Sequence, residues 1–366
     1  MFDRRLIQHF DWGLLGLTLV LMGIGLATLF SAVKGGGAEL SRLYLKQTIW
    51  FGGGLVAMAA CFLFNYRKLE RWGPMVYGFS IALLLAVHAF GRVVSGSRRW
   101  LVLGPVSIQP SEFAKIAVVI ILARYFAKQV TTRGFTLREL VTPALLTALP
   151  FALVVKQPDL GTAMLIALVA GSMALFVKIE WRSMVTLIAG GLLGVPGVWF
   201  LLKDYQKLRI LTFLNPDRDP LGAGYHIIQS KIAIGSGMFW GKGYLKGTQN
   251  NLAFLPEQHT DFIFSVLAEE WGFAGTVVVL FLFVILVIWG LSIADHCREP
   301  FGKILCIGLT AMVFWQVFIN IAMVMGAMPV VGVPLPFISY GGSSALTLMM
   351  VIGLMLNVSM RRFMID

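Results

Sequence analysis

The residues best placed to do chemistry in this chain are ionisable side chains at the edges of long apolar stretches. A charge in such a stretch is costly to bury, so it usually faces an internal cavity or a partner group. Asp261 is the clearest case, because it stands where the polar run from Glu257 to Thr260 meets a long apolar segment. A partly desolvated carboxylate beside His259 could accept a proton from a substrate. Helix N-capping, a role that Asp and Thr favour, is the alternative interpretation.

Glu112 and Lys115 form a second candidate pair. Residues three apart are neighbours on one face of a helix, so these side chains can form an ion pair. Such a pair either fixes helix packing or lines a cavity and positions a polar substrate, and the two roles are compatible. Asp159 begins another apolar segment, where N-capping is the simpler interpretation. Of Glu269 and Glu270, at most one is expected to face the same cavity as Asp261, since adjacent helical residues point about 100° apart. Burial with a basic or backbone partner is the alternative for both.

Basic side chains are the third kind of candidate. Arg98 and Arg99 stand beside Trp100, and planar guanidinium groups match phosphate geometry while the aromatic side chain can stack against a ring. Alternatively, the two arginines snorkel and anchor the chain at a membrane surface. Lys231 adds positive charge to a long polar segment. A cationic cavity of this kind would suit an anionic pyrophosphate.

Several enzyme classes lack their motifs here. The chain holds no GxxxxGK[ST] phosphate loop, no HExxH motif and no GxSxG elbow, so ATP hydrolysis, zinc proteolysis and elbow-serine chemistry are unsupported. Cys61, Cys297 and Cys306 form no CxxC pair, and neither a disulfide framework nor a zinc site is indicated. The net charge of +12 sits in short runs between apolar segments, which argues against nucleic-acid binding.

The elements that must position these residues are membrane-spanning helices. Of the 366 residues, 58% are hydrophobic and 13% are charged, whereas soluble domains carry about 25% charged residues. A spanning helix needs about 20 apolar residues, because the hydrocarbon core is about 30 Å thick. The sequence therefore predicts an all-α polytopic membrane protein that forms a single domain over residues 1–366. Its ten predicted spans cover residues 12–32, 46–65, 72–90, 111–127, 140–156, 160–178, 183–202, 262–293, 303–326 and 343–360.

The distribution of Lys and Arg predicts the orientation of these spans. Cytoplasmic loops carry the excess of the two residues. The termini and alternate short loops hold 15 of them, and the opposite short loops hold seven. Both termini are therefore expected in the cytoplasm, and the long segment 203–261 is expected outside it.

Three outer regions do not look like ordinary helix. Region 91–111 carries the two arginines, and region 203–261 is so long that it is either functional or disordered. An amphipathic run from Tyr225 to Ile234 argues against disorder. Region 326–342 has three prolines and no charge, and it is expected to fold back into the protein, where irregular backbone is shielded from lipid. Between the fifth and sixth spans, Lys156 to Asp159 predicts a tight hairpin.

Taken in chain order, these segments resemble the SEDS family of bacterial shape, elongation, division and sporulation proteins (RodA, FtsW and SpoVE), and most closely its RodA branch. One position departs from a common form of the pattern, because Gln258 stands where many relatives have arginine, and no phosphate contact is assigned to it. The motifs follow the family order over nearly the whole chain. They are Arg98 to Trp100, Gln109 to Lys115, Gln157 to Thr162, Gly222 to His226, Gln229 to Gly235, Leu255 to Phe264 and Pro329 to Gly342.

The resemblance implies a ten-span peptidoglycan glycosyltransferase of the bacterial cytoplasmic (inner) membrane, which polymerises lipid II during cell elongation and shape maintenance. It also implies a class B penicillin-binding protein, a transpeptidase, as partner within an elongation complex. Charge on the departing pyrophosphate would be compensated by basic residues or by a divalent cation such as Mg²⁺ or Mn²⁺. By motif match, Asp261 is the family's essential aspartate and Glu112 with Lys115 its cavity ion pair. The predicted substrate-binding residues are Arg98, Arg99, Glu112, Lys115, Asp159, Lys231 and His259.

Two other functions stay open on the sequence alone. A lipid II flippase or other transporter would also have many spans and charges near the membrane midplane. Against it, the polar motifs cluster on one side, and no pair of interrupted helices recurs in the two halves. The second alternative is a non-catalytic membrane scaffold that only activates its partner.

Overall fold

The computed structural model describes residues 10–34, 37–94, 97–104, 106–129, 133–201, 204–215, 222–251 and 258–362. Each of the ten predicted spans corresponds to a helix in it. These helices are α2 (Trp12–Lys34), α3 (Gly37–Leu63), α4 (Arg67–Phe90), α5 (Pro110–Lys128), α6 (Leu137–Lys156), α7 (Leu160–Phe176), α8 (Trp181–Leu201), α12 (Ile263–His296), α13 (Pro300–Val324) and α14 (Gly342–Arg361). Among the described residues, α2, α4, α6, α12, α13 and α14 are long and apolar enough to cross a membrane, and α7 is a shorter apolar helix.

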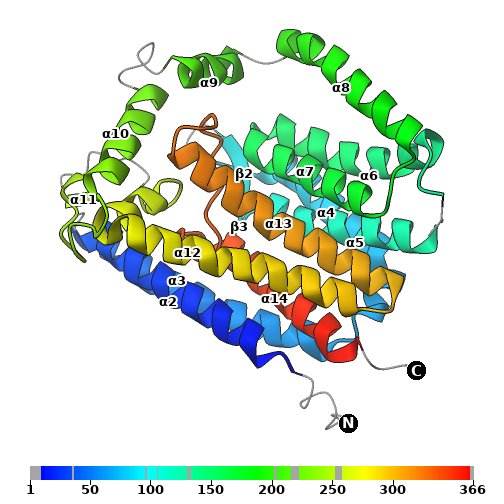
Figure 1. Cartoon of the computed structure of the whole chain (residues 1–366), viewed down its shortest axis with the longest axis horizontal. Helices are drawn as coiled ribbons and strands as arrows, with labels where there is room; N and C mark the ends of the chain where they lie inside the picture. Colours follow the sequence, from blue (N-terminus) through cyan, green and yellow to red (C-terminus); the bar gives the residue numbers. More distant parts are fainter. Residues whose placement is uncertain are drawn as a thin grey trace.

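The bundle is built around α5, α13 and α14, which are buried on nearly all sides. A helix that is apolar all round needs other helices around it, whereas α4 and α6 bury one side only and leave the other to lipid. The start of α2 and the end of α14, the described residues nearest to the two chain termini, lie at one end of this bundle (Figure 1). There Ser359, near the end of α14, donates to Asp11, just before α2, at 3.3 Å.

A small sheet, which the sequence did not predict, lies between α4 and α5. It consists of β1 (Arg92–Val94), β2 (Ser97–Leu103) and β3 (Val106–Ile108), antiparallel and in that order. Leu101 pairs with Ile108, and β3 leads directly into α5. The sheet thereby carries Arg98 and Arg99 to the start of the helix that holds Glu112.

The long segment 203–261 contains further helices, so the prediction of an ordered amphipathic run is confirmed. They are α9 (Asp204–Leu214), α10 (Ala223–Ser236) and α11 (Thr248–Asn251). Most side chains of α8 are exposed, and α8 and α9 lie at the edge of the bundle (Figure 1). Residues 252–257, which include the start of the motif Leu255 to Phe264, lie outside the described residues.

The α12 helix is interrupted at Gly272, whose φ of 64° departs from helical geometry. Such a break leaves backbone groups unpaired, which is costly near lipid. The loop 238–243 pairs four of them at 2.8 to 3.0 Å, and it is thereby fixed against α12. The four hydrogen bonds run from backbone N–H to backbone carbonyl: from Lys242 to Glu269, from Gly243 to Glu270, from Phe273 to Met238 and from Ala274 to Phe239.

Candidate active site

Four helices, α5, α7, α12 and α14, begin next to one another at the end of the bundle opposite to the chain termini. The Gln109 N–H donates to Ser343 Oγ at 3.0 Å, which joins the starts of α5 and α14. The Gln109 side chain donates to Asp159 Oδ2 at 3.1 Å, which adds the start of α7. The Tyr340 N–H donates to the His259 carbonyl at 2.9 Å, just before α12. Because each helix N-terminus carries a partial positive charge, this arrangement favours an anionic ligand.

The predicted ion pair between Glu112 and Lys115 forms among these helix starts. Lys115 Nζ donates to Glu112 Oε1 at 2.8 Å, and both side chains are at most 4% exposed. The second oxygen of Glu112 and the hydroxyl of Ser111 are buried and have no hydrogen-bond partner among the described residues. Buried polar atoms are normally paired, so two orphans beside an ion pair favour a role in meeting a polar ligand over one in packing alone.

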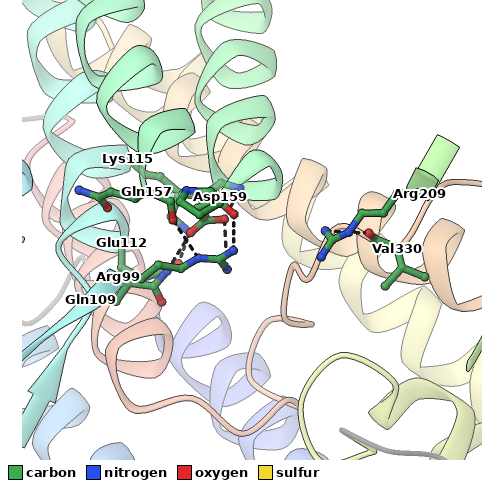
Figure 2. Close-up of polar contacts among 10 residues, drawn as sticks. Arg99, Gln109, Glu112, Lys115, Gln157, Asp159, Arg209 and Val330 are labelled. Carbon is green, nitrogen blue, oxygen red and sulfur yellow. Dashed lines mark hydrogen bonds and ion pairs between the residues drawn. The ribbon is translucent and has the colours of Figure 1, made fainter. Parts of the chain in front are cut away.

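Asp159 and Arg99 hold the tight turn between α6 and α7 that the sequence predicted (Figure 2). Asp159 is the N-cap of α7, and its two carboxylate oxygens accept from the Thr162 N–H and hydroxyl at 3.2 and 3.0 Å. Arg99 donates to the carbonyl of Gln157 at 3.3 Å and to that of Pro158, and its Nη1 lies 3.8 Å from Asp159 Oδ1. The capping interpretation of Asp159 is therefore confirmed, and the Arg99 guanidinium is engaged by this turn.

The turn 258–262 presents Asp261 at the start of α12. Its N-cap residue is Phe262 and not Asp261, which weakens the capping interpretation of the aspartate. The Asp261 side chain is partly exposed and lies over Gly332, where an added Cβ would be 3.4 Å from Oδ2. Helix α2, helix α13 and the segment 326–341 hold this turn through four hydrogen bonds. The hydrogen bonds run from the Gln258 side chain to the Ala32 carbonyl (3.0 Å), from the Tyr340 N–H to the His259 carbonyl (2.9 Å), from the Ser339 hydroxyl to the Thr260 carbonyl (2.6 Å) and from Asn320 Nδ2 to the Asp261 carbonyl (3.0 Å).

The proline-rich segment 326–341 folds back into the bundle, as the sequence predicted, and most of its residues from Val331 to Ser339 are buried. Four consecutive residues of it contact four different parts of the fold, so the segment connects the Asp261 turn with α7, α9 and α13. Arg209 of α9 donates to the Val330 carbonyl at 3.2 Å (Figure 2), Gly161 of α7 packs against Val331, Gly332 faces Asp261, and Asn320 donates to the Val333 carbonyl at 2.8 Å.

The remaining predicted residues lie around this centre. Arg98 is exposed on β2. Lys231 is exposed on α10, and its side chain crosses Gly326 just after α13. The His259 ring lies 6.0 Å from the Tyr340 ring, measured between centroids. Arg98 and Lys231 are thus the predicted basic residues that face solvent, in contrast to Arg99.

Glu269 and Glu270 have partners of their own. Glu269 accepts four hydrogen bonds from the segment 242–249, the shortest from Lys242 Nζ at 2.7 Å. Glu270 accepts from the Ser31 hydroxyl of α2. Glu269 therefore fixes the segment 242–249 against the interrupted helix, and Glu270 fixes this helix against α2.

Sequence reasoning missed three residues that organise the site, Gln109, Arg209 and Asn320. Asn320 had a signal that it shares with Gln316, because a polar side chain inside an apolar spanning helix is a candidate functional residue. Gln109 was noted only as the first residue of the motif Gln109 to Lys115, and Arg209 stands in a loop segment where a basic residue gives no signal of its own.

No group of three or more His, Cys, Asp or Glu side chains in the described part of the chain is arranged to hold a metal ion. Mg²⁺ is usually bound by one or two carboxylates together with substrate phosphates.

An apolar groove of about 440 Å³ runs along the bundle between α4 and α5, starting beside the site. Leu101 and Ile108 of the sheet line it at that end, next to Phe113. Leu69 and Leu354 line it further toward the end where the chain termini lie. Its almost wholly apolar lining suits a long hydrocarbon chain.

Comparison with known proteins places these features in a family context. The model of the cell cycle protein family of FtsW, RodA and SpoVE matches residues 10–363. The chain is 46% identical to the peptidoglycan glycosyltransferase MrdB of Escherichia coli (strain K12), over 86% of this chain and 84% of MrdB. It is similar to a chain of a peptidoglycan synthase complex that coordinates polymerization and crosslinking, with a TM-score of 0.83, 33% identity and coverage of 97% and 98%. Its similarity to the rod shape determining protein RodA of Thermus thermophilus has a TM-score of 0.72, with 29% identity and coverage of 97% and 98%.

Proposed function

Because the chain belongs to the FtsW, RodA and SpoVE family of cell cycle proteins, we propose that it polymerises lipid II at the outer face of the bacterial cytoplasmic membrane with Asp261 as general base. Its activity is that of a peptidoglycan glycosyltransferase of the RodA and MrdB type, used in cell elongation and shape maintenance. The observation that carries the assignment of the base is the position of Asp261, held by three elements where four helix N-termini meet.

The chemistry is an inverting glycosyl transfer. The 4-hydroxyl of the acceptor GlcNAc loses its proton to Asp261 as its oxygen attacks the anomeric carbon of the donor MurNAc. The bond from that carbon to undecaprenyl pyrophosphate breaks, and the pyrophosphate leaves with the electron pair. A base must stay in one place relative to the attacking oxygen, and the backbone bonds of the turn 258–262 supply that rigidity.

The leaving pyrophosphate gains negative charge in the transition state and needs compensation. The converging N-termini of α5, α7, α12 and α14 supply partial positive charge, whereas the charge of Lys115 is balanced by Glu112. Arg98 and Lys231 are exposed and can reach a phosphate without breaking internal bonds. Arg99 is assigned a supporting role, because its guanidinium holds the turn before α7. Asp159 acts with it, and His259 stands two residues before the base, with its ring 6.0 Å from that of Tyr340.

The apolar groove between α4 and α5 is the place for the polyprenyl chain of a substrate. Lipid is as apolar as the lining of the groove, so the tail would be held there by van der Waals packing and not by hydrophobic transfer. A groove that begins at the sheet, beside the helix of Glu112, lets the tail lie along the bundle while the pyrophosphate reaches the helix starts.

The orientation follows from combining the charge count with the fold. The site lies at the end of the bundle away from the chain termini (Figure 1). With both termini cytoplasmic, as the excess of Lys and Arg favours, Asp261 faces the outer side, where glycan strands are made.

The partner is a class B penicillin-binding protein that cross-links the glycan. The similarity to a chain from a peptidoglycan synthase complex supports an assembly in which polymerisation and cross-linking are joined. Other proteins of an elongation complex are expected to join this pair.

The test is polymerisation of labelled lipid II by purified protein together with its penicillin-binding partner. Asp261→Asn keeps the shape of the side chain and removes the base, so the rate is expected to fall by about 10²- to 10⁴-fold. Equal rates for wild type and Asp261→Asn would rule out this base. Absence of polymer from the wild-type pair would favour a flippase or a scaffold, which a lipid II translocation assay in vesicles then separates.

A further inference from the structure

The Asn320 side chain hydrogen-bonds both the Asp261 turn (258–262) and the proline-rich segment 326–341. Its Nδ2 donates to the Asp261 carbonyl at 3.0 Å and to the Val333 carbonyl at 2.8 Å. An amide nitrogen carries two N–H groups, so both are used. The side chain is fully buried, about one turn before the end of α13.

We infer that Asn320 is a positioning residue for the base. By bonding two carbonyls through one nitrogen, it sets the separation between the Asp261 turn and the segment 326–341. This inference rests on the proposed role of Asp261 and deepens it. The Asp261 carboxylate lies over Gly332, the residue next to Val333, so a shift of either carbonyl moves the carboxylate relative to the surface beneath it.

The chemistry of the two carbonyls selects asparagine at this position. Both groups are acceptors, so the side chain between them has to offer two donors. Aspartate has the same shape but would direct oxygen at both carbonyls, and leucine would leave both without this partner. Because a misplacement of about 1 Å can slow an enzyme about 100-fold, losing these bonds is expected to affect turnover more than binding.

The chain offers a matched control one turn earlier on α13. Gln316 is also fully buried, and neither its amide oxygen nor its amide nitrogen has a hydrogen-bond partner among the described residues. Gln316→Leu removes a buried amide from the same helix without removing a bond to the Asp261 turn.

The experiment measures lipid II polymerisation by the complex with its partner, for wild type, Asn320→Leu, Asn320→Asp and Gln316→Leu, across lipid II concentration and pH. For both Asn320 variants, kcat is expected to fall about 10- to 100-fold. KM for lipid II is expected to stay within about threefold, because the binding groups are untouched. The acidic limb of the pH profile, which reports titration of the base, is expected to shift. Gln316→Leu is expected to match wild type in kcat, in KM and in the acidic limb of the pH profile.

Rates are normalised to folded protein by size exclusion and thermal unfolding, so that lost folding does not count as lost catalysis. If Asn320→Leu does not fold, Asn320→Ser is measured with the same readouts, since a small hydroxyl is tolerated in spanning helices. Wild-type kcat and an unshifted acidic limb of the pH profile in the Asn320 variants would overturn this inference and leave the proposed base standing. Wild-type activity of Asp261→Asn would instead overturn the proposed base, and this inference with it.

Discussion

Neutralising Lys115 should reveal what the buried ion pair does. Lys115→Met removes the ammonium that lies 2.8 Å from Glu112 and leaves that carboxylate buried without its cation. Breaking a buried pair in this way costs about 3–5 kcal/mol of stability, whereas replacing both partners by neutral groups is often close to neutral. The double variant with Glu112→Gln is therefore expected to recover most of the lost stability. The polymerisation rate of the double variant should nevertheless stay low, because the Glu112–Lys115 pair that meets the substrate is absent from it as well.

The assay compares unfolding and lipid II polymerisation for the two single variants and the double variant. The matched control is the pair of Arg67 and Glu299, which is 3.5 Å long with side chains 30% and 25% exposed. Breaking a half-buried pair costs less than breaking a fully buried one, so Arg67→Met should lower the free energy of unfolding less than Lys115→Met does. The reasoning is refuted if Lys115→Met destabilises no more than Arg67→Met. Full recovery of polymerisation in the double variant would reduce the pair to a packing role.

Three further changes test other parts of the structure. A methyl group at Gly237 would collide with the Ala268 carbonyl oxygen, whereas Gly235 has open space, so Gly237→Ala should lower the melting temperature and Gly235→Ala should not. Arg99→Lys keeps the charge but cannot hold both carbonyls of the turn before α7, and a loss of about 1–3 kcal/mol is expected in denaturant unfolding. Lys303 lies 3.8 Å from Asp295 in an exposed pair at the end of the bundle away from the proposed site, so Lys303→Gln should leave glycan synthesis unchanged in the lipid II assay.

Helix placement was predictable from sequence because the constraint is local. A bilayer admits only apolar segments with internally paired backbone, and each of the ten predicted segments corresponds to a helix; among the described residues, six of these helices are long and apolar enough to cross a membrane. The pairing of Glu112 with Lys115 and the hairpin before Asp159 were predictable for the same reason, since three or four residues of spacing determine them.

The small sheet escaped prediction because its strands are short and carry no alternation that distinguishes them from an outer loop. Arg99 shows a different limit. Its guanidinium has the chemistry to bind phosphate, and its engagement with the Gln157 and Pro158 carbonyls became visible only when residues about 60 positions away were placed beside it.

What the sequence by itself determined about this protein is therefore its membrane architecture and the set of residues able to do chemistry, because apolar length and residue type act locally. The tertiary structure alone decided which of those residues meet. Asp261 lies over Gly332 and shares Asn320 with Val333 because α12, α13 and the segment 326–341 pack together. Contacts across such distances in the chain depend on how whole helices pack, and no spacing within one segment encodes them.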